Sequence, residues 1–152
     1  MLSLIFPQIF TLKDIFSFSF TRPLDLPLTG HVAKVLQGQI FISGEQNSDY
    51  LCLASMLLYR PDTGSTYLAN MTKPQAHHCM EILGERLYVA GGITTHDACE
   101  VYSPAEDSWT AFTSLPVPHV GAGTAVLEGK IYVLGGYSQE GCSDTKLVHR
   151  YD

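Results

Sequence analysis

The sequence predicts an all-β protein built from repeated sheets, and three observations carry that prediction. Apolar segments that end in glycine recur at intervals of 47 and 44 residues, and a proline precedes each segment at the same two intervals. No apolar pattern of helical period is sustained along the chain. The 152 residues include 13 glycines, 8 prolines and 8 tyrosines, a composition typical of a chain rich in strands and turns.

The recurring segments span residues 36–44, 83–92 and 127–136, and the prolines are Pro27, Pro74 and Pro118. Each segment holds three consecutive apolar residues, at 40–42, 87–89 and 131–133. Successive side chains of a strand point to opposite faces, so such a strand has no face for water. We therefore expect each sheet to lie between two neighbouring sheets.

Glycines and aromatic residues follow the segments in a fixed order. A glycine pair suits a sharp bend with positive φ or a close approach of two backbones. Because a residue that recurs once per unit is expected to pack rather than to bind a ligand, we assign structural roles to the recurring positions. These positions are Gly44, Gly91, Gly92, Gly135, Gly136, Tyr59, Tyr102, Tyr151 and Trp109.

The second unit predicts four strands, at about 78–83, 86–90, 98–102 and 109–112, with a tight turn at 104–107. Four antiparallel strands per unit at a period near 45 residues are typical of a β-propeller blade. Propellers close with about 4–8 blades. The chain is therefore expected to form about three blades of a ring that it does not close alone.

The order of glycine pair, Tyr102 and Trp109 resembles the kelch repeat, and residues 115–123 and 129–136 resemble motifs of the Kelch-like (BTB–kelch) proteins. The resemblance implies repeats at 27–73, 74–117 and 118–152, the last stopping before its fourth strand. The first repeat departs from the pattern, since Glu45 replaces the second glycine and Tyr67 is expected to replace the tryptophan. Upstream, residues 16–26 are either the last strand of a preceding blade or an unrelated leader, and residues 1–15 stay unassigned.

Net charge and the absence of recognisable targeting signals indicate which partners and which cellular location to expect. With 9 Lys and Arg against 15 Asp and Glu, the net charge of −6 argues against nucleic-acid or anionic-membrane partners. The apolar N-terminus lacks a basic region before the apolar run and is too short for a membrane span. The expected location is therefore intracellular and cytoplasmic. Cys52, Cys79, Cys99 and Cys142 include no C-x-x-C pair, which favours buried thiols over two disulfides.

No catalytic constellation is recognisable, so we expect neither an enzyme nor a cofactor. Residues 121–123 lack the third glycine of a dinucleotide loop, and no G-x-S-x-G elbow occurs. Residues 77–79 and 96–97 are the clusters that most resemble metal ligands, but they lack ligand spacing, and adjacent strand residues point to opposite faces.

The kelch resemblance implies that loops between second and third strands, together with the linkers between blades, bind a protein partner. The corresponding loops are 45–51, 93–97 and 137–145, which contain no Lys or Arg, and the linkers lie near 72–77 and 116–121. Their acids either favour a basic partner or are ordinary solvated loop residues. The candidate contact residues are Glu45, Asn47, Asp49, His96, Asp97, Gln139, Glu140, Asp144, His77 and His119.

These observations favour a non-enzymatic protein-interaction module. The resemblance implies substrate recognition for cullin-RING ubiquitin ligases. The alternatives are an actin or cytoskeletal scaffold, and a truncated isoform without independent activity. Open blade edges also predict a tendency to self-association.

Overall fold

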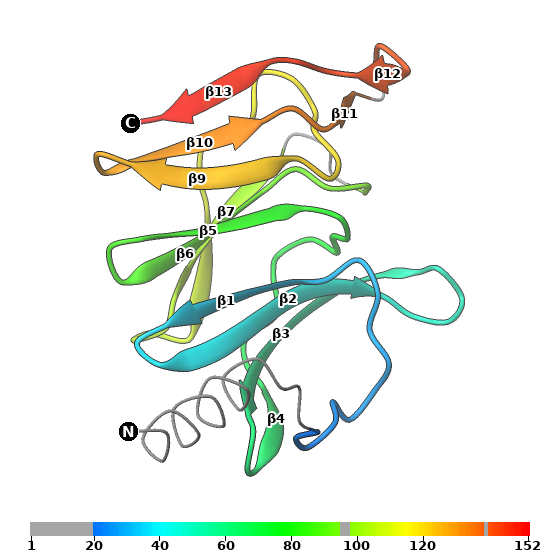
Figure 1. The fold of residues 1–152 in the computed structure, drawn as a ribbon, viewed down its shortest axis with the longest axis vertical. Helices are drawn as coiled ribbons and strands as arrows, with labels where there is room; N and C mark the ends of the chain where they lie inside the picture. Colours follow the sequence, from blue (N-terminus) through cyan, green and yellow to red (C-terminus); the bar gives the residue numbers. More distant parts are fainter. Residues whose placement is uncertain (1–19, 95–97, 139) are drawn as a thin grey trace, which may run out of the picture.

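The computed structural model describes residues 20–94, 98–138 and 140–152. Their strands form three antiparallel sheets that follow one another along the molecule, and a separate two-stranded ribbon (Figure 1). The all-β prediction is confirmed for these residues, none of which is helical. Residues 1–19 lie outside the described residues, and with them the unassigned residues 1–15 and the first part of the segment 16–26 that was expected to be a strand or a leader. The described part of that segment, residues 20–26, forms no strand.

The sheets have the strand content expected of successive propeller blades. The first sheet consists of β1 (Val32–Leu36), β2 (Gln39–Gln46), β3 (Cys52–Arg60) and β4 (Gly64–Tyr67). The second consists of β5 (Cys79–Leu83), β6 (Arg86–Ala90), β7 (Cys99–Ser103) and β8 (Ser108–Ala111). The third consists of β9 (Gly123–Leu127), β10 (Lys130–Leu134) and β13 (Val148–Tyr151), with a short ribbon of β11 (Tyr137–Ser138) and β12 (Ser143–Asp144) beside it. The described residues form an unclosed ring.

The recurring tyrosines occupy the same register in all three sheets. Tyr59, Tyr102 and Tyr151 each pair with the first residue of the apolar triplet on the neighbouring strand. In the second sheet Trp109 pairs with Tyr102 in turn. The tyrosine and the apolar triplet of each repeat therefore occupy equivalent positions in the centre of each sheet.

Tyr67 does not take the place of the tryptophan, so that expectation is wrong. Tyr59 pairs with Ser65, while Tyr67 lies two residues further along β4 and is 58% exposed. The cause is the turn. Three residues separate the paired ends of β3 and β4, whereas four separate the paired ends of β7 and β8. Because the first turn is shorter, the residue of β4 that pairs with the tyrosine is Ser65.

The replacement of a glycine by Glu45 lengthens the first sheet. Where the second and third sheets have a glycine pair with positive φ, the first has a bulge at Gly44, after which pairing resumes between Glu45 and Leu53. The strand β2 therefore has eight residues, whereas β6 and β10 have five each.

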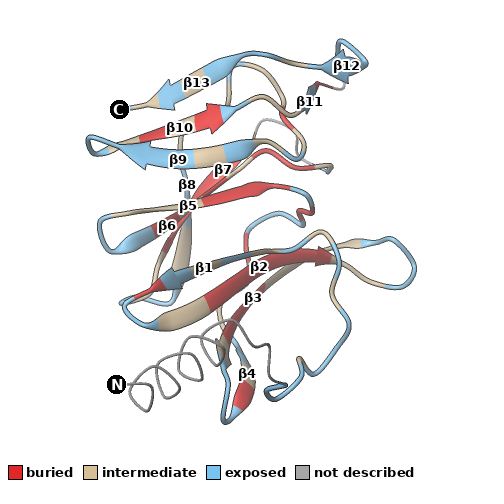
Figure 2. Cartoon of the chain, in the orientation of Figure 1, coloured by how far each residue is buried: buried red, intermediate tan, exposed pale blue. Residues whose placement is uncertain are grey.

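The main core lies between the first and second sheets (Figure 2). Its buried members are Leu36, Phe41, Met56, Leu58, Met71, Met80, Leu87, Val89 and Tyr102, with Trp109 packed against them. Cys79 and Cys99 are buried as expected, whereas Cys142 is exposed, contrary to the expectation of a buried thiol.

Candidate functional site

The loops between second and third strands meet the linkers between sheets at one end of the molecule, on the right of Figure 1. Backbone hydrogen bonds tie them together: the Gln46 amide donates to the Thr29 carbonyl at 2.8 Å and the Ile93 amide to the Ala76 carbonyl at 2.9 Å. The Tyr137 amide likewise donates to a carbonyl of the second linker at 2.9 Å. We call the described residues of 45–51, 72–77, 93–94, 116–121 and 137–145 the loop end.

Two glycines show how closely the linkers approach the sheets. A Cβ at Gly92 would lie 3.0 Å from the Ala76 carbonyl oxygen, and one at Gly136 would lie 2.8 Å from the Val120 carbonyl oxygen. Both glycines have positive φ, at 110° and 94°. The second glycine of each pair is therefore required for the linker to lie against the sheet.

The residues expected to contact a partner fall into three groups. Asp49, His77, Glu140 and Asp144 are exposed at the loop end, and Asn47 is half-buried there. Glu45 and His119 are buried, and so offer no surface to a partner. His96, Asp97 and Gln139 lie outside the described residues.

Glu45 and His119 hold the loop end from within. The Ser55 hydroxyl donates to Glu45 Oε1 at 2.8 Å. The Nδ1 atom of His119 is hydrogen-bonded to the Gly135 carbonyl, while the His119 carbonyl accepts the Gly92 amide at 2.9 Å. The Glu45 side chain therefore ties β2 to β3, and His119 ties its linker to the second and third sheets, roles that their positions in the sequence did not reveal.

The most exposed apolar side chains of the loop end were not predicted. Asn47 Oδ1 accepts the amides of Asp49 and Leu51, both at 3.0 Å, and the Asn47 amide donates to the Leu51 carbonyl at 3.1 Å. This closed turn holds Tyr50 at a φ of 60°, with Tyr50 81% and Leu51 61% exposed. The Asn-x-Asp spacing, typical of a turn closed by its own side chain, is the signal that identifies it.

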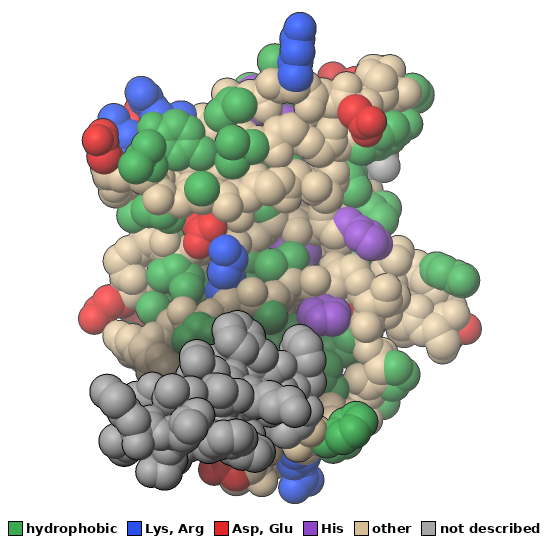
Figure 3. Space-filling view, viewed as in Figure 1, with side chains coloured by type: hydrophobic (Ala, Val, Ile, Leu, Met, Phe, Trp, Pro, Cys, Tyr) green, Lys and Arg blue, Asp and Glu red, His purple; other side chains and the backbone are tan. Residues whose placement is uncertain are grey.

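The charge at the loop end is negative. Asp49, Glu140 and Asp144 are exposed and outnumber the exposed Lys73 of the first linker, and loops 45–51, 93–97 and 137–145 contain no Lys or Arg. Figure 3 shows histidine and hydrophobic side chains exposed along this edge. The exposed histidines include His31 and His77. The surface thus combines apolar groups with acids.

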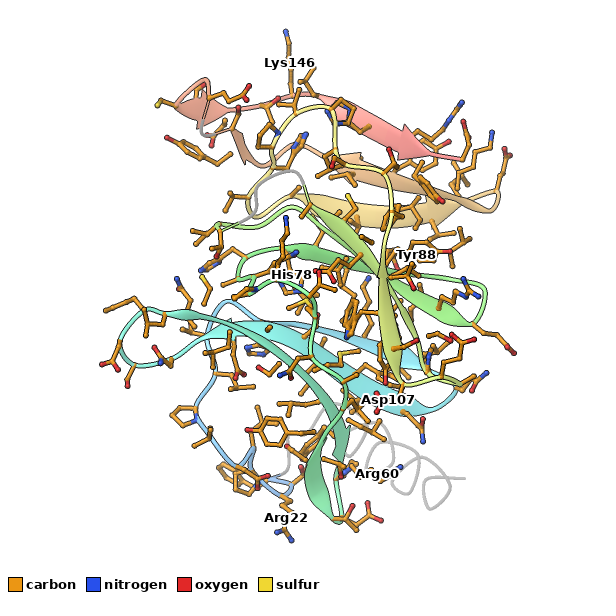
Figure 4. All side chains as sticks on the ribbon, turned by 180° about the vertical axis from the view of Figure 1, so that it is seen from behind. Arg22, Arg60, His78, Tyr88, Asp107 and Lys146 are labelled. Carbon is orange, nitrogen blue, oxygen red and sulfur yellow. The ribbon has the colours of Figure 1, made fainter. Side chains whose placement is uncertain are left out.

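His78 lies beneath this surface (Figure 4) and is not part of it. One of its ring nitrogens, Nε2, lies 2.8 Å from the Ser43 hydroxyl. Burial, with the neighbouring charges of His77 and His31, lowers the pKa of His78 to about 4. The adjacent Cys79 thiol has its pKa raised to about 11, chiefly by burial. A neutral imidazole and an un-ionised thiol are suited to packing.

Among residues 20–94, 98–138 and 140–152, no three His, Cys, Asp or Glu side chains form a group that could hold a metal ion. The same residues contain no helix that is long and apolar enough to cross a membrane.

Comparison with known proteins agrees with the fold. The family model described as Kelch motif matches residues 76–116 and 118–152, together half of the chain. Beta-scruin of Limulus polyphemus is 30% identical over 139 residues, which are 80% of this chain and 15% of that protein. Kelch-like protein 36 of Rattus norvegicus is 30% identical over 135 residues, 81% of this chain and 22% of that protein.

The chain thus spans less than a quarter of either relative. Among solved structures, that of YjhT aligns with a TM-score of 0.69 at 22% identity, covering 80% of this chain and 38% of YjhT, which shows a common fold. Motif matches, relatives and sheet architecture agree, and the chain belongs to the kelch-repeat family, as a propeller fragment that resembles the Kelch-like proteins.

Proposed function

We propose that the loop end binds a protein partner, with Tyr50 and Leu51 at the centre of the contact. Kelch repeats serve as protein-interaction modules. The observation that carries the proposal is the turn closed by Asn47, which holds two large apolar side chains in water at fixed positions. Tyrosine held in this way provides contact area at low entropic cost, and aromatic residues are enriched in interface centres.

The acids around the turn favour a partner segment that carries Lys or Arg. Asp49 flanks Tyr50 directly, and Glu140 and Asp144 extend the negative charge to the third sheet. Exposed charges of this kind chiefly accelerate association and select partners, so binding should weaken as salt is added.

Within this function, the finer proposal is that the chain recognises substrates for a cullin-RING ubiquitin ligase. The support is its similarity to the Kelch-like relatives. The alternative hypothesis is that the chain is an actin scaffold, and co-sedimentation with filamentous actin distinguishes the two hypotheses. If the chain pellets with actin and the Tyr50→Asn variant does not, the actin hypothesis replaces the ligase proposal.

The experiment is site-specific photo-crosslinking in cells from position 50, with position 128 as control. Glu128 is exposed and has a φ of 51°, close to that of Tyr50, but it lies in the turn between β9 and β10 at the opposite end of the sheets. We expect a partner that crosslinks through position 50 and not through position 128.

The recombinant partner is then titrated against the two variants. Tyr50→Asn should weaken binding by more than about tenfold, as expected of a hot-spot aromatic, and Glu128→Asn should leave it unchanged. Asparagine tolerates positive φ, so both variants keep the turn. Equal crosslinking from the two positions, or equal affinity of the two variants, would contradict the proposal.

A further inference from the structure

A pocket of about 100 Å³ lies beside the loop end, where the first linker meets the second sheet. Thr72 and Lys73 of the linker line it, together with Ala111 of β8 and Ser114 beyond β8, and all four are exposed. Glu100 of β7 also lines the pocket and is only 1% exposed. The exposed residues therefore form the mouth of the pocket, and Glu100 lies at its inner end.

One carboxylate oxygen of Glu100 has a hydrogen-bond donor and the other does not. The Thr72 amide donates to Oε2 at 2.8 Å. Oε1 is buried and has no hydrogen-bond partner among the described residues. Strand pairing fixes the position of the carboxylate, because Glu100 pairs with Val89 on one side and with Ala111 on the other. A buried acceptor without a donor costs free energy, so the inner end of the pocket favours a ligand that brings a donor.

Glu100 is not a recurring position of the repeat. The residues that stand two places before the recurring tyrosines are Leu57, Glu100 and His149. The first and third sheets therefore have no acid at this place. We expect recurring positions to serve packing, and a buried acid that occurs in one sheet alone is a candidate for binding.

Lys73 is the cation of this chain that lines the pocket, and it does not neutralise Glu100. Among the described residues the ion pairs join Lys34 to Glu81, and Lys130 and Arg150 to Asp152. Lys73 is instead exposed at the mouth. Its ammonium group there repels an entering cation, whereas the carboxylate attracts one, so the two residues should have opposite effects on the binding of a cation.

The other walls suit an aliphatic stem with an ammonium group at its end. Ala111 and Phe112 are apolar, and Thr72 and Ser114 have hydroxyl oxygens that can accept N–H groups. A lysine side chain has an apolar four-carbon stem and three N–H donors. The guanidinium of arginine pairs best with both oxygens of one carboxylate, and one oxygen of Glu100 is already taken by the linker. The pocket therefore favours lysine over arginine.

We propose that this pocket binds a lysine side chain of the protein partner, with the ammonium group at Glu100 Oε1 and the stem between Ala111 and Phe112. The proposal rests on the proposed function, since the lysine belongs to the partner that contacts the loop end. It assigns the basic partner residue to one carboxylate, whereas the exposed acids of the loop end accelerate its approach.

The test follows the amide signals of the isotope-labelled chain by NMR while Nα-acetyl-lysine methylamide is added. This compound carries the lysine side chain and no backbone charge. We expect saturable shifts at Thr72, whose amide donates to Glu100, and at residues 111–114. The arginine compound should bind more weakly, and acetylation of the lysine side chain should abolish the shifts because it removes the charge.

Variants of the chain locate the site. Glu100→Gln keeps an oxygen acceptor for the linker amide, removes the charge and should weaken binding of the lysine compound by more than about tenfold. Glu128→Gln removes one charge at an exposed position and should leave the binding unchanged. Lys73→Gln should strengthen the binding by about two- to fivefold, the effect of one exposed charge. Ala111→Leu should block the pocket, with Ala105→Leu in an exposed turn of the same sheet as its control.

Several outcomes would overturn the proposal. These are equal binding to Glu100→Gln and to the unaltered chain, equal binding of the lysine and arginine compounds, and shifts spread over the exposed acids, which would indicate non-specific attraction to the net charge of −6. A partner that Tyr50→Asn weakens, but neither Glu100→Gln nor Ala111→Leu does, would also overturn the lysine site while the proposed function stands. Saturable lysine binding at Thr72 with a partner indifferent to Tyr50→Asn would support the lysine site and contradict the function proposed for Tyr50.

Discussion

Replacing Trp109 by alanine tests whether the repeat packs as the structure shows. The indole packs against the core, pairs with the Tyr102 ring at 5.1 Å and donates to the Ala69 carbonyl at 2.8 Å. The hydrogen bond contributes about 1 kcal/mol and the aromatic pair about 1 kcal/mol. Large aromatic truncations in cores cost about 3–5 kcal/mol, and because Trp109 is only half-buried we expect the lower end, about 3 kcal/mol.

The measurement is thermal unfolding followed by far-ultraviolet circular dichroism, since Trp109 is the sole tryptophan and its fluorescence disappears with it. A loss of about 3 kcal/mol should lower the melting temperature of a chain of this size by about 6–12 °C. Trp109→Phe keeps a ring but loses the N–H group. It should lower the free energy of unfolding by about 1 kcal/mol relative to the unaltered chain. A melting temperature unchanged in Trp109→Ala would refute the packing role.

Three further predictions concern contacts elsewhere in the fold. Gly136→Ala should destabilise the chain by at least about 2 kcal/mol more than Gly129→Ala, because both glycines have positive φ but a Cβ at Gly129 has no neighbour within 4 Å. Stability should fall by up to about 3 kcal/mol as the pH drops from 6.5 to 4, because the buried His78 has its pKa lowered to about 4 and the unfolded chain takes up the proton first. Tyr102→Phe should cost about 1 kcal/mol, and it should raise the pKa of Asp107, which the Ala69 amide and then the Tyr102 hydroxyl hold below its usual range.

Each of these has a direct readout. Chemical denaturation compares the two glycine variants, and equal losses would remove the argument from the close approach of the linker. Melting temperatures across pH 4–7 should depend less on pH in His78→Gln, and an unaltered slope would assign the acid sensitivity to other groups. The pKa of Asp107, measured by NMR titration, should move upward in Tyr102→Phe, and a fixed value would contradict the hydrogen bond.

The sheets could be predicted from sequence because their signals are local and repeated. Strands of the second unit begin and end within one residue of the predicted bounds, since apolar triplets and glycine pairs mark the same points that the hydrogen bonding marks. The place of Tyr67 could not be predicted in the same way. It depends on the number of residues in one turn, and a single residue more or less changes which side chain faces Tyr59.

The loop end was predictable in position but not in its exposed residues. Loop acids resemble one another in sequence, yet Asp49 is exposed while Glu45 is buried with the Ser55 hydroxyl. The two acids differ because Glu45 lies in the part of β2 that still pairs with β3 after Gly44, whereas Asp49 lies in the turn beyond it. How far the pairing continues depends on the partner strand. Tyr50 and Leu51 were overlooked because exposed apolar residues resemble core residues in a sequence.

The departure of the first repeat from the kelch pattern explains why its loop differs from the others. In the second and third sheets two glycines with positive φ end the second strand. In the first sheet Glu45 resumes the ladder after Gly44, and pairing runs on to Gln46 and Cys52. The Asn47 turn therefore lies at the end of a hairpin whose strand β2 has eight residues, against five in each of β6 and β10 (Figure 1). The residue that weakens the match to the repeat, Glu45, is thus the one that places Tyr50 at the tip of the hairpin, where we propose that a partner binds. Repeat positions that deviate are where the binding specificity of such a chain should be sought.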